Sequence, residues 1–165
     1  MKAIIFFTRV PIAGKTKTRM QPYLSSDECA TLHKAMIKDI YKECRKIQAD
    51  IFVYYTPIEG LERLQKIIGT KHAYKLQKGD NIGEKMYNAI AEVLDLGYES
   101  CILIGSDIAE LRKEHINRAF DKLENADIVF GKTVDGGYYL VGMKKAVKEV
   151  FEVEKYGNSD VFANT

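Results

Sequence analysis

The chain has 165 residues, of which 46% are hydrophobic and 29% are charged, with 25 Lys and Arg against 23 Asp and Glu. This composition is typical of a globular domain and excludes disordered and collagen-like classes. A chain of this length buries roughly two thirds of the surface that it exposes when unfolded, so it needs neither disulfides nor a structural metal to fold. We therefore expect a single domain over residues 1–165.

The charge and hydropathy patterns narrow the classes of partner. A formal net charge of +2 lacks the broad basic surface of nucleic-acid-binding proteins, so that class is disfavoured. The longest apolar runs, over residues 3–7 and 101–104, are far shorter than the ~20 residues of a membrane span. The N-terminus lacks the long apolar core of a signal peptide. We expect a cytoplasmic protein with no membrane contact.

The three cysteines are Cys29, Cys44 and Cys101. Their number is odd and they form no C-x-x-C pair, so neither a disulfide framework nor a zinc ribbon is indicated. Cys29 and His33 lie one helical turn apart, as two metal ligands would, but no second pair completes a tetrahedral site. We expect all three cysteines to be buried thiols.

The first expected strand covers residues 3–8, a β-branched and aromatic run. A long loop without hydrophobic periodicity follows over residues 9–24. Ser25 and Glu28 then form the pattern of a capping box. Apolar residues recur from there to residue 47 at steps of three and four, which predicts a long amphipathic helix.

Apolar runs and amphipathic stretches alternate along the rest of the chain. Further strands are expected over residues 51–55, 72–76, 101–104, 127–130 and 138–142. Further helices are expected over residues 60–68, 82–94 and 113–123. Asn81 is the expected N-cap of the second of these helices, with Glu84 at its third position.

Strands separated by helices form βαβ units, and right-handed crossovers give a mainly parallel sheet with helices on both faces. The closing strand, turn and strand predict a mixed edge. In such sheets, ligands bind beyond the carboxyl ends of the strands, where the strand order switches. This rule selects the loops that follow Thr8, Ile104 and Phe130.

The loop after the first strand is rich in cations. Four basic residues and two hydroxyl residues occur without an intervening acid; they are Arg9, Lys15, Thr16, Lys17, Thr18 and Arg19. Guanidinium and ammonium groups form charge-assisted bonds to phosphate oxygens, so we interpret the loop, with Gly14, as a phosphate-binding loop. The sequence Gly14-Lys15-Thr16 resembles the end of a P-loop, but that pattern requires glycine where Arg9 stands. A merely solvated basic loop is the alternative.

Asp107 follows an apolar strand directly, in the sequence Gly105-Ser106-Asp107. A carboxylate at the end of a central strand suits a Mg²⁺ ion that also binds phosphates. The alternative is that Asp107 caps a turn or helix.

Asp135 lies in the sequence Asp135-Gly136-Gly137, which predicts a hairpin turn between the last two strands. A functional interpretation is compatible with this turn. Asp135 would be a second metal or hydroxyl ligand, and the glycines would allow close approach of a sugar or nucleotide. Gly79 and Gly83 flank a predicted helix N-terminus, which favours an anion, although an ordinary capped turn explains them equally.

In combination, these motifs resemble a bacterial family of glycosyltransferase-A-type (GT-A), nucleotide-diphospho-sugar-transferase-like proteins, often described as radical-SAM or selenodomain-associated transferases. The resemblance is carried by residues 7–19, 77–79, 83–86, 105–108, 135–140 and 156–165. It implies a GT-A fold, which is a three-layer α/β/α Rossmann-like sandwich. It further implies nucleotide binding by the N-terminal half, Mg²⁺ or Mn²⁺ at an acidic strand end, and kinship with guanylyl- and cytidylyltransferases.

We therefore expect a metal-dependent transferase that acts on a nucleotide or nucleotide-sugar donor and a small-molecule acceptor. Lys15, Lys17 and Arg19 would stabilise the negative charge that develops during transfer. Asp107 would hold the metal, and Asp135 would bind it too or orient the acceptor hydroxyl. The sequence does not choose between nucleotidyl and glycosyl transfer.

Family members generally continue beyond the position of Thr165, and Ala109 stands where they usually have proline. A degenerate or non-catalytic nucleotide-binding module of the same fold is therefore the alternative. A homodimer is compatible with a small α/β domain, but no pattern indicates one.

Overall fold

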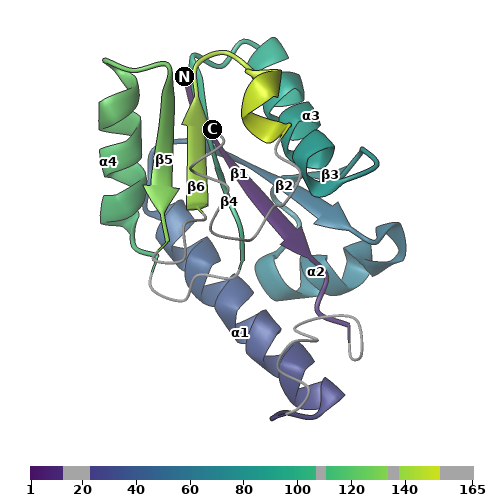
Figure 1. The fold of residues 1–165 in the computed structure, drawn as a ribbon. Helices are drawn as coiled ribbons and strands as arrows, with labels where there is room; N and C mark the ends of the chain where they lie inside the picture. Colours follow the sequence, from purple (N-terminus) through teal and green to yellow (C-terminus); the bar gives the residue numbers. More distant parts are fainter. Residues whose placement is uncertain (13–22, 107–110, 134–137, 153–165) are drawn as a thin grey trace.

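A computed structural model of the chain describes residues 1–12, 23–106, 111–133 and 138–152. These residues form one β-sheet with helices packed on both of its faces (Figure 1). In chain order the elements are β1 (Lys2–Arg9), α1 (Ser26–Arg45), β2 (Asp50–Thr56), the 3₁₀ helix η2 (Ile58–Gly60), α2 (Leu61–Ile68), β3 (Ala73–Leu76), α3 (Ile82–Asp95), β4 (Ser100–Ile104), α4 (Lys113–Leu123), β5 (Ile128–Lys132), β6 (Tyr138–Met143) and the 3₁₀ helix η3 (Lys148–Phe151).

The sheet has six strands in the order β3-β2-β1-β4-β6-β5. Strands β1 to β4 are parallel, and β6 runs antiparallel to both of its neighbours. Strand β5 therefore has the same direction as β1, and the arrowheads of both point to the lower side in Figure 1. The predicted mainly parallel sheet with a mixed edge is confirmed. The strand order switches between β1 and β4.

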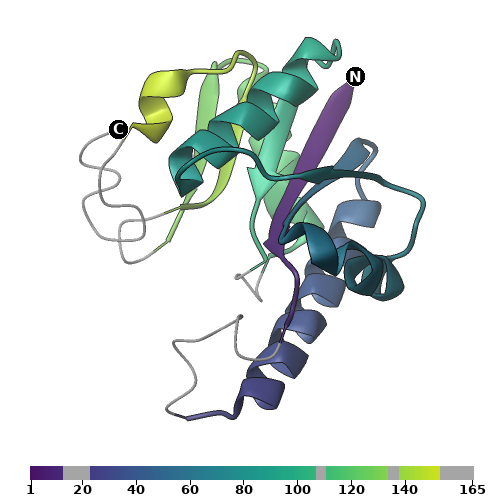
Figure 2. The ribbon, with the colours of Figure 1, turned by 90° about the vertical axis from the view of Figure 1, so that its right-hand side faces the viewer.

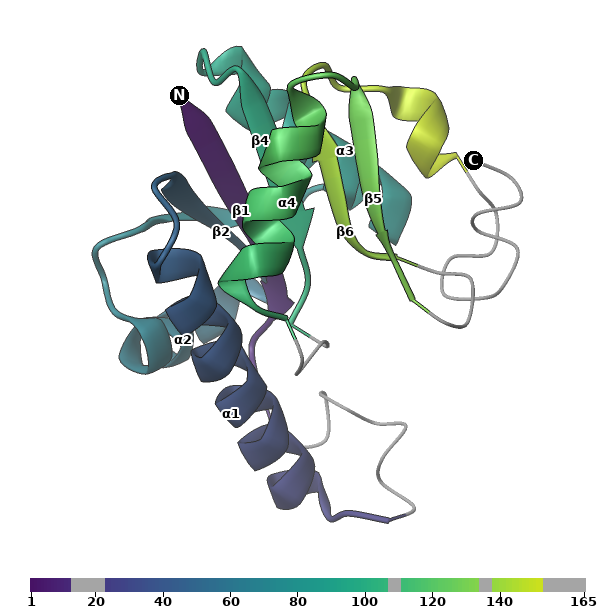
Figure 3. The ribbon, with the colours of Figure 1, turned by 90° about the vertical axis from the view of Figure 1, so that its left-hand side faces the viewer.

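The two faces of the sheet carry separate apolar clusters. On one face, Ile4 and Phe6 of β1 pack with buried residues of α1, α2 and α4, which are in front in Figure 3. On the other face, Ile5 and Phe7 pack with buried residues of α3 and η3, which are in front in Figure 2. Because successive side chains of a strand point to opposite faces, one buried strand serves both clusters. The result is the expected three-layer α/β/α sandwich.

Both predicted helix starts are confirmed. The Ser25 hydroxyl accepts a hydrogen bond from the Glu28 amide at 3.1 Å, and the Glu28 carboxylate accepts one from the Ser25 amide at 2.9 Å. Asn81 caps α3 by accepting a bond from the Glu84 amide at 2.9 Å. These caps satisfy amides that have no partner within the helix.

The three cysteines are all buried and free, as predicted. Burial raises the pKa of the Cys44 and Cys101 thiols to about 12, so both stay protonated near neutral pH. In the part of the chain that the structure describes, no three His, Cys, Asp or Glu residues are grouped to hold a metal. Cys29 and His33 therefore form no such site within it.

Most predicted element boundaries agree with the structure to within two residues, and the differences concern short elements. The 3₁₀ helix η3 was not predicted, although its Val150 and Phe151 complete the cluster beneath α3. Four residues are too few for helical periodicity to identify such an element. None of the helices within the described residues is long and apolar enough to cross a membrane.

Candidate functional site

The carboxyl ends of three strands lie at one edge of the sheet. Arg9 is the last residue of β1, Ile104 the last of β4 and Lys132 the last of β5, and these strands share one direction. The chain leaves this edge after each strand toward one of the three motifs predicted from the sequence. Since β1 and β4 flank the switch in strand order, this carboxyl edge is where an open α/β sheet binds ligands.

Most of the predicted site residues lie outside the described residues. They are Gly14, Lys15, Thr16, Lys17, Arg19, Asp107, Asp135, Gly136 and Gly137. Their roles, including metal binding by the two aspartates, stay predictions. The described members are Arg9, which is exposed at the end of β1, and Gly79 and Gly83 at the start of α3.

A buried polar cluster lies where β1 and β4 end. The Thr8 hydroxyl lies 2.8 Å from the Ser106 hydroxyl, which lies 2.9 Å from Nε2 of His33. All three residues are buried. The sheet register explains the contact between Thr8 and Ser106. Phe6 of β1 is opposite Ile104 of β4, and Thr8 and Ser106 each lie two residues further along the chain. His33 reaches the pair from α1, which covers this face.

Gln77 directly follows β3 and contacts the carboxyl ends of the neighbouring strands. Its side-chain amide donates to the main-chain oxygens of Thr8 at 3.0 Å and Tyr54 at 3.1 Å. Its own main-chain amide donates to the oxygen of Tyr55 at 2.9 Å. One buried residue therefore fixes the ends of β1, β2 and β3 relative to one another.

The loop from Gln77 to α3 requires glycine at position 79. Gly79 has a φ of +144°, and a Cβ there would lie 2.8 Å from Cβ of Glu84 and 2.9 Å from the Lys85 nitrogen. Glu84 also accepts a bond from the Asp80 amide at 2.7 Å. The loop is thus packed closely against the first turn of α3, whose N-terminus carries the positive end of the helix dipole.

The beginning of the basic loop is anchored on α2 and β2. The Val10 amide donates to the Thr56 oxygen at 2.9 Å, and Arg63 donates to the Pro11 oxygen at 3.3 Å. Beside Pro11, a groove of about 320 Å³ runs between α1 and α2 and is lined by three cations, Lys34, Arg63 and Lys66. The described start of the loop therefore lies against a positively charged surface.

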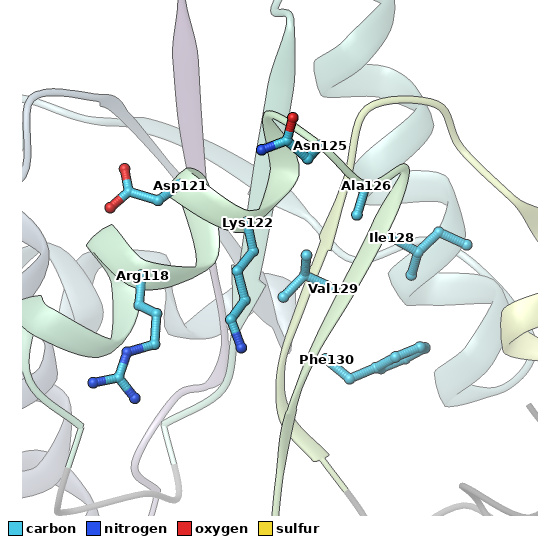
Figure 4. Close-up of a pocket in the computed structure, with 8 residues that line it drawn as sticks. All are labelled: Arg118, Asp121, Lys122, Asn125, Ala126, Ile128, Val129 and Phe130. Atoms are coloured by element: carbon cyan, nitrogen blue, oxygen red, sulfur yellow. The ribbon is translucent and has the colours of Figure 1, made fainter.

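A larger groove, of about 560 Å³, lies between α4 and β5 (Figure 4). Its lining includes Arg118, Asp121 and Asn125 from α4 and the turn after it, and Val129 and Phe130 from β5. Because α4 runs back from the carboxyl edge, its last residues and the start of β5 are at the opposite edge of the sheet. This groove therefore begins where α4 ends and β5 starts, and none of the predicted site residues lines it.

Sequence reasoning did not predict the roles of Thr8, His33, Ser106 and Gln77. A signal was present, because a histidine occupies the apolar face of α1 and a threonine ends the apolar run of β1. Polar side chains at buried positions are hydrogen-bonded, but the hydrophobic periodicity of the sequence does not show which residues are their partners.

Comparisons with solved structures define the class. A candidate nucleotide-diphospho-sugar transferase from Desulfovibrio desulfuricans G20 matches with a TM-score of 0.92 and 31% identity, over 99% of this chain and 72% of that one. A Mycobacterium tuberculosis H37Rv protein crystallised with manganese matches with a TM-score of 0.57 and 13% identity, over 98% of this chain and 80% of that one. The latter likeness concerns the fold alone. The domain has the GT-A-like fold of nucleotidyltransferases and nucleotide-sugar transferases.

Residues 40–158 match the model of a family described as "Uncharacterized protein conserved in bacteria (DUF2064)". The chain therefore belongs to the DUF2064 family. The 2-phospho-L-lactate guanylyltransferase of Methanocaldococcus jannaschii is 28% identical over 159 residues, which are 96% of this chain and 66% of the relative. The enzyme of the same name from Methanocaldococcus fervens is 28% identical over 160 residues. The chain spans about two thirds of the length of these relatives.

Proposed function

We propose that this chain is a nucleotidyltransferase that transfers a nucleoside monophosphate group from a nucleoside triphosphate to a phosphate-bearing small molecule. The observation that carries the proposal is the homology with 2-phospho-L-lactate guanylyltransferases over 96% of the chain. Guanosine triphosphate and 2-phospho-L-lactate are accordingly the first donor and acceptor to test. Of the two reactions expected from the sequence, this homology favours nucleotidyl over glycosyl transfer.

The carboxyl edge supports this function. The basic loop that begins at Arg9 supplies Lys15, Lys17 and Arg19 for the triphosphate, with Gly14 and Thr16 beside them. At the start of α3, Gly79 and Gly83 bring main-chain groups close to a bound nucleotide.

The two aspartates are suited to a divalent cation. Asp107 follows β4 by three residues and Asp135 follows β5 by three residues, and both strands end at the carboxyl edge. Their carboxylate oxygens fit Mg²⁺ or Mn²⁺, the expected cofactor. A bound cation would neutralise charge on the phosphate oxygens. Gly136 and Gly137, next to Asp135 in the sequence, would allow close approach of a sugar or nucleotide.

The chemistry is a substitution at phosphorus. An oxygen of the acceptor phosphate forms a bond to the α-phosphorus of the donor, and the bond from that phosphorus to the bridging oxygen of pyrophosphate breaks. The leaving pyrophosphate takes the electron pair, so negative charge increases on its oxygens. Lys15, Lys17 and Arg19 stabilise that charge.

The test is an assay of the purified chain with guanosine triphosphate, 2-phospho-L-lactate and Mg²⁺ or Mn²⁺, in which released pyrophosphate is measured. Other nucleoside triphosphates and nucleotide-sugars serve as alternative donors. Pyrophosphate release that requires the acceptor supports the proposal. Release of a nucleoside diphosphate from a nucleotide-sugar indicates glycosyl transfer, and binding without turnover indicates a non-catalytic module.

Binding is measured first by thermal shift, because a ligand at 100 times its dissociation constant stabilises the fold by about 2.7 kcal/mol. Arg19→Ala is expected to weaken triphosphate binding about tenfold or more while nucleoside binding changes little. Lys122→Ala, which removes an exposed cation from α4 at the opposite edge, is the control. Equal losses for triphosphate and nucleoside would contradict phosphate binding by Arg19.

Asp107→Asn is expected to abolish the dependence of nucleotide binding on Mg²⁺. Asp121→Asn, which changes an exposed carboxylate on α4, is the control and should leave the Mg²⁺ titration unchanged. A normal Mg²⁺ titration in the Asp107 variant would remove that residue from the metal site.

A further inference from the structure

The cluster of Thr8, His33 and Ser106 joins three elements that are far apart in the sequence. Thr8 belongs to β1, His33 to α1, and Ser106 follows β4 by two residues. Their exposed fractions are only 3%, 3% and 5%. A buried hydroxyl that loses its partner costs about 1–3 kcal/mol, so the fold strongly favours the geometry that satisfies all three groups.

Ser106 is the central member of this cluster. Its oxygen lies 2.8 Å from the Thr8 hydroxyl and 2.9 Å from Nε2 of His33. Ser106 has one hydroxyl proton and accepts through its lone pairs. It can therefore accept from Thr8 and donate to a neutral imidazole, or, in the other tautomer, accept from His33 and donate to Thr8, whose own proton then goes to the main-chain oxygen of Arg9 at 2.9 Å. In either case two buried partners fix its side chain.

The members of the cluster also adjoin, in the sequence, the basic loop and Asp107, the two parts of the proposed site. The basic loop runs from the end of β1 to the start of α1, so Thr8 and His33 flank it on both sides. Ser106 is joined to Asp107 by one peptide bond. A shift of α1 when phosphates bind would consequently act on Ser106 through His33, and a shift of the chain after β4 would act on α1.

We propose that Thr8, His33 and Ser106 are positioning residues that couple binding of the donor triphosphate to binding of the divalent cation. This inference rests on the proposed function. None of the three residues is assigned to the reacting atoms or to the metal. Their role is to make the two binding events depend on each other, and such coupling is reciprocal by thermodynamic necessity.

The experiment measures the dissociation constant of guanosine triphosphate without and with saturating MgCl₂. The ratio of the two constants measures the coupling. In Ser106→Ala and His33→Leu the ratio is expected to fall about tenfold, the equivalent of losing one buried hydrogen bond. His33→Gln is expected to keep most of the ratio, because its side-chain nitrogen reaches a position similar to Nε2 of histidine.

Ile40→Val is the matched control for lost stability. Ile40 is buried on the same helix, in the apolar cluster on that face of the sheet, and it lies two turns from His33. The variant loses stability while its ratio should equal that of the wild type. An unchanged ratio in both Ser106→Ala and His33→Leu would overturn the inference, as would a ratio that simply follows the free energy of unfolding.

A second measurement separates this inference from the proposed function. If the wild-type chain responds to neither guanosine triphosphate nor Mg²⁺ nor any other donor, the proposed function fails. Amide hydrogen exchange then tests the coupling of the elements themselves. His33→Leu should raise exchange at residues 102–106, and Ser106→Ala should raise it in α1 around residue 33. Changes confined to the mutated element, or equal changes in Ile40→Val, would overturn the inference.

Discussion

The side-chain nitrogen of Gln77 lies 3.0 Å from the main-chain oxygen of Thr8, although 69 residues separate them in the sequence. Because the same nitrogen is 3.1 Å from the oxygen of Tyr54, both hydrogens of one amide group are used on the ends of two strands. The end of β1 is therefore fixed just before the basic loop begins.

Gln77→Ala is expected to destabilise the protein by about 2 kcal/mol, because two main-chain acceptors lose their donor in a buried place. The free energy of unfolding is measured by urea denaturation. Lys78→Ala, which changes the next and exposed side chain, is the control and should cost less than about 0.5 kcal/mol. Losses of equal size in the two variants would show that Gln77 does not hold the strand ends.

Gly79→Ala is expected to be more harmful than Gly97→Ala. Both glycines have positive φ angles, +144° and +105°, but only at Gly79 would a Cβ overlap neighbouring atoms. Gly97→Ala thus measures backbone strain alone, about 1 kcal/mol, and Gly79→Ala adds the overlap with Glu84 and Lys85. Thermal unfolding compares the two.

Equal destabilisation of these two variants would contradict the close packing of the loop on α3. With guanosine triphosphate present, Gly79→Ala should also show a smaller thermal shift than Gly97→Ala, because only Gly79 lies at the carboxyl edge. That second comparison depends on the proposed function, whereas the first does not.

The layered fold was predictable from the sequence because its signals are local. The capping residues Ser25 and Asn81 determine where two helices begin, and the alternation of strands and helices determines the parallel sheet. Strand direction alone then predicts that the carboxyl ends of β1, β4 and β5 lie at one edge of the sheet.

The polar contacts at that edge were not predictable, because their partners are distant in the sequence. The pattern of α1 places His33 on the buried face, but Ser106 is 73 residues away and nothing local pairs the two. The register that sets Thr8 beside Ser106 comes from burial of both faces of β1 and β4, which is a property of the assembled sheet. Asp107 and Asp135 lie outside the described residues, and the Mg²⁺ titration of Asp107→Asn tests the predicted metal binding by the first of them.

Glu43 provides a prediction about acid stability. Its carboxylate accepts bonds from the Lys46 ammonium at 2.6 Å and from the main-chain amide of Lys113, the first residue of α4, at 3.0 Å. These two bonds lower the pKa of Glu43 from its usual value of 4.5. The stability that Glu43 contributes is therefore complete above about pH 4.5 and is lost as the pH falls through the lower, folded-state pKa.

Glu43→Gln is consequently expected to cost about 1–2 kcal/mol at pH 7, and this difference should shrink as the pH approaches 3. Free energies of unfolding from pH 7 to pH 3 provide the measurement. Glu62→Gln, which breaks an exposed pair with Lys66 at 3.8 Å, should change stability little at any pH. Parallel pH curves for the wild type and Glu43→Gln would exclude this role of the carboxylate.

Gly131 and Tyr139 provide a prediction about strands β5 and β6, which flank Asp135 in the sequence. A Cβ at position 131 would lie 2.6 Å from Cζ of Tyr139, because the ring covers the glycine across the β5–β6 pair. Gly131→Ala is expected to cost about 1–2 kcal/mol by displacing that ring.

Tyr139→Leu removes the outer ring atoms, so in the double variant the alanine methyl should be tolerated. A double-mutant cycle on free energies of unfolding should therefore show a favourable interaction between the two changes of about 1 kcal/mol. Strict additivity would mean that the ring does not hold the glycine, and the register of β5 and β6 would then be set elsewhere.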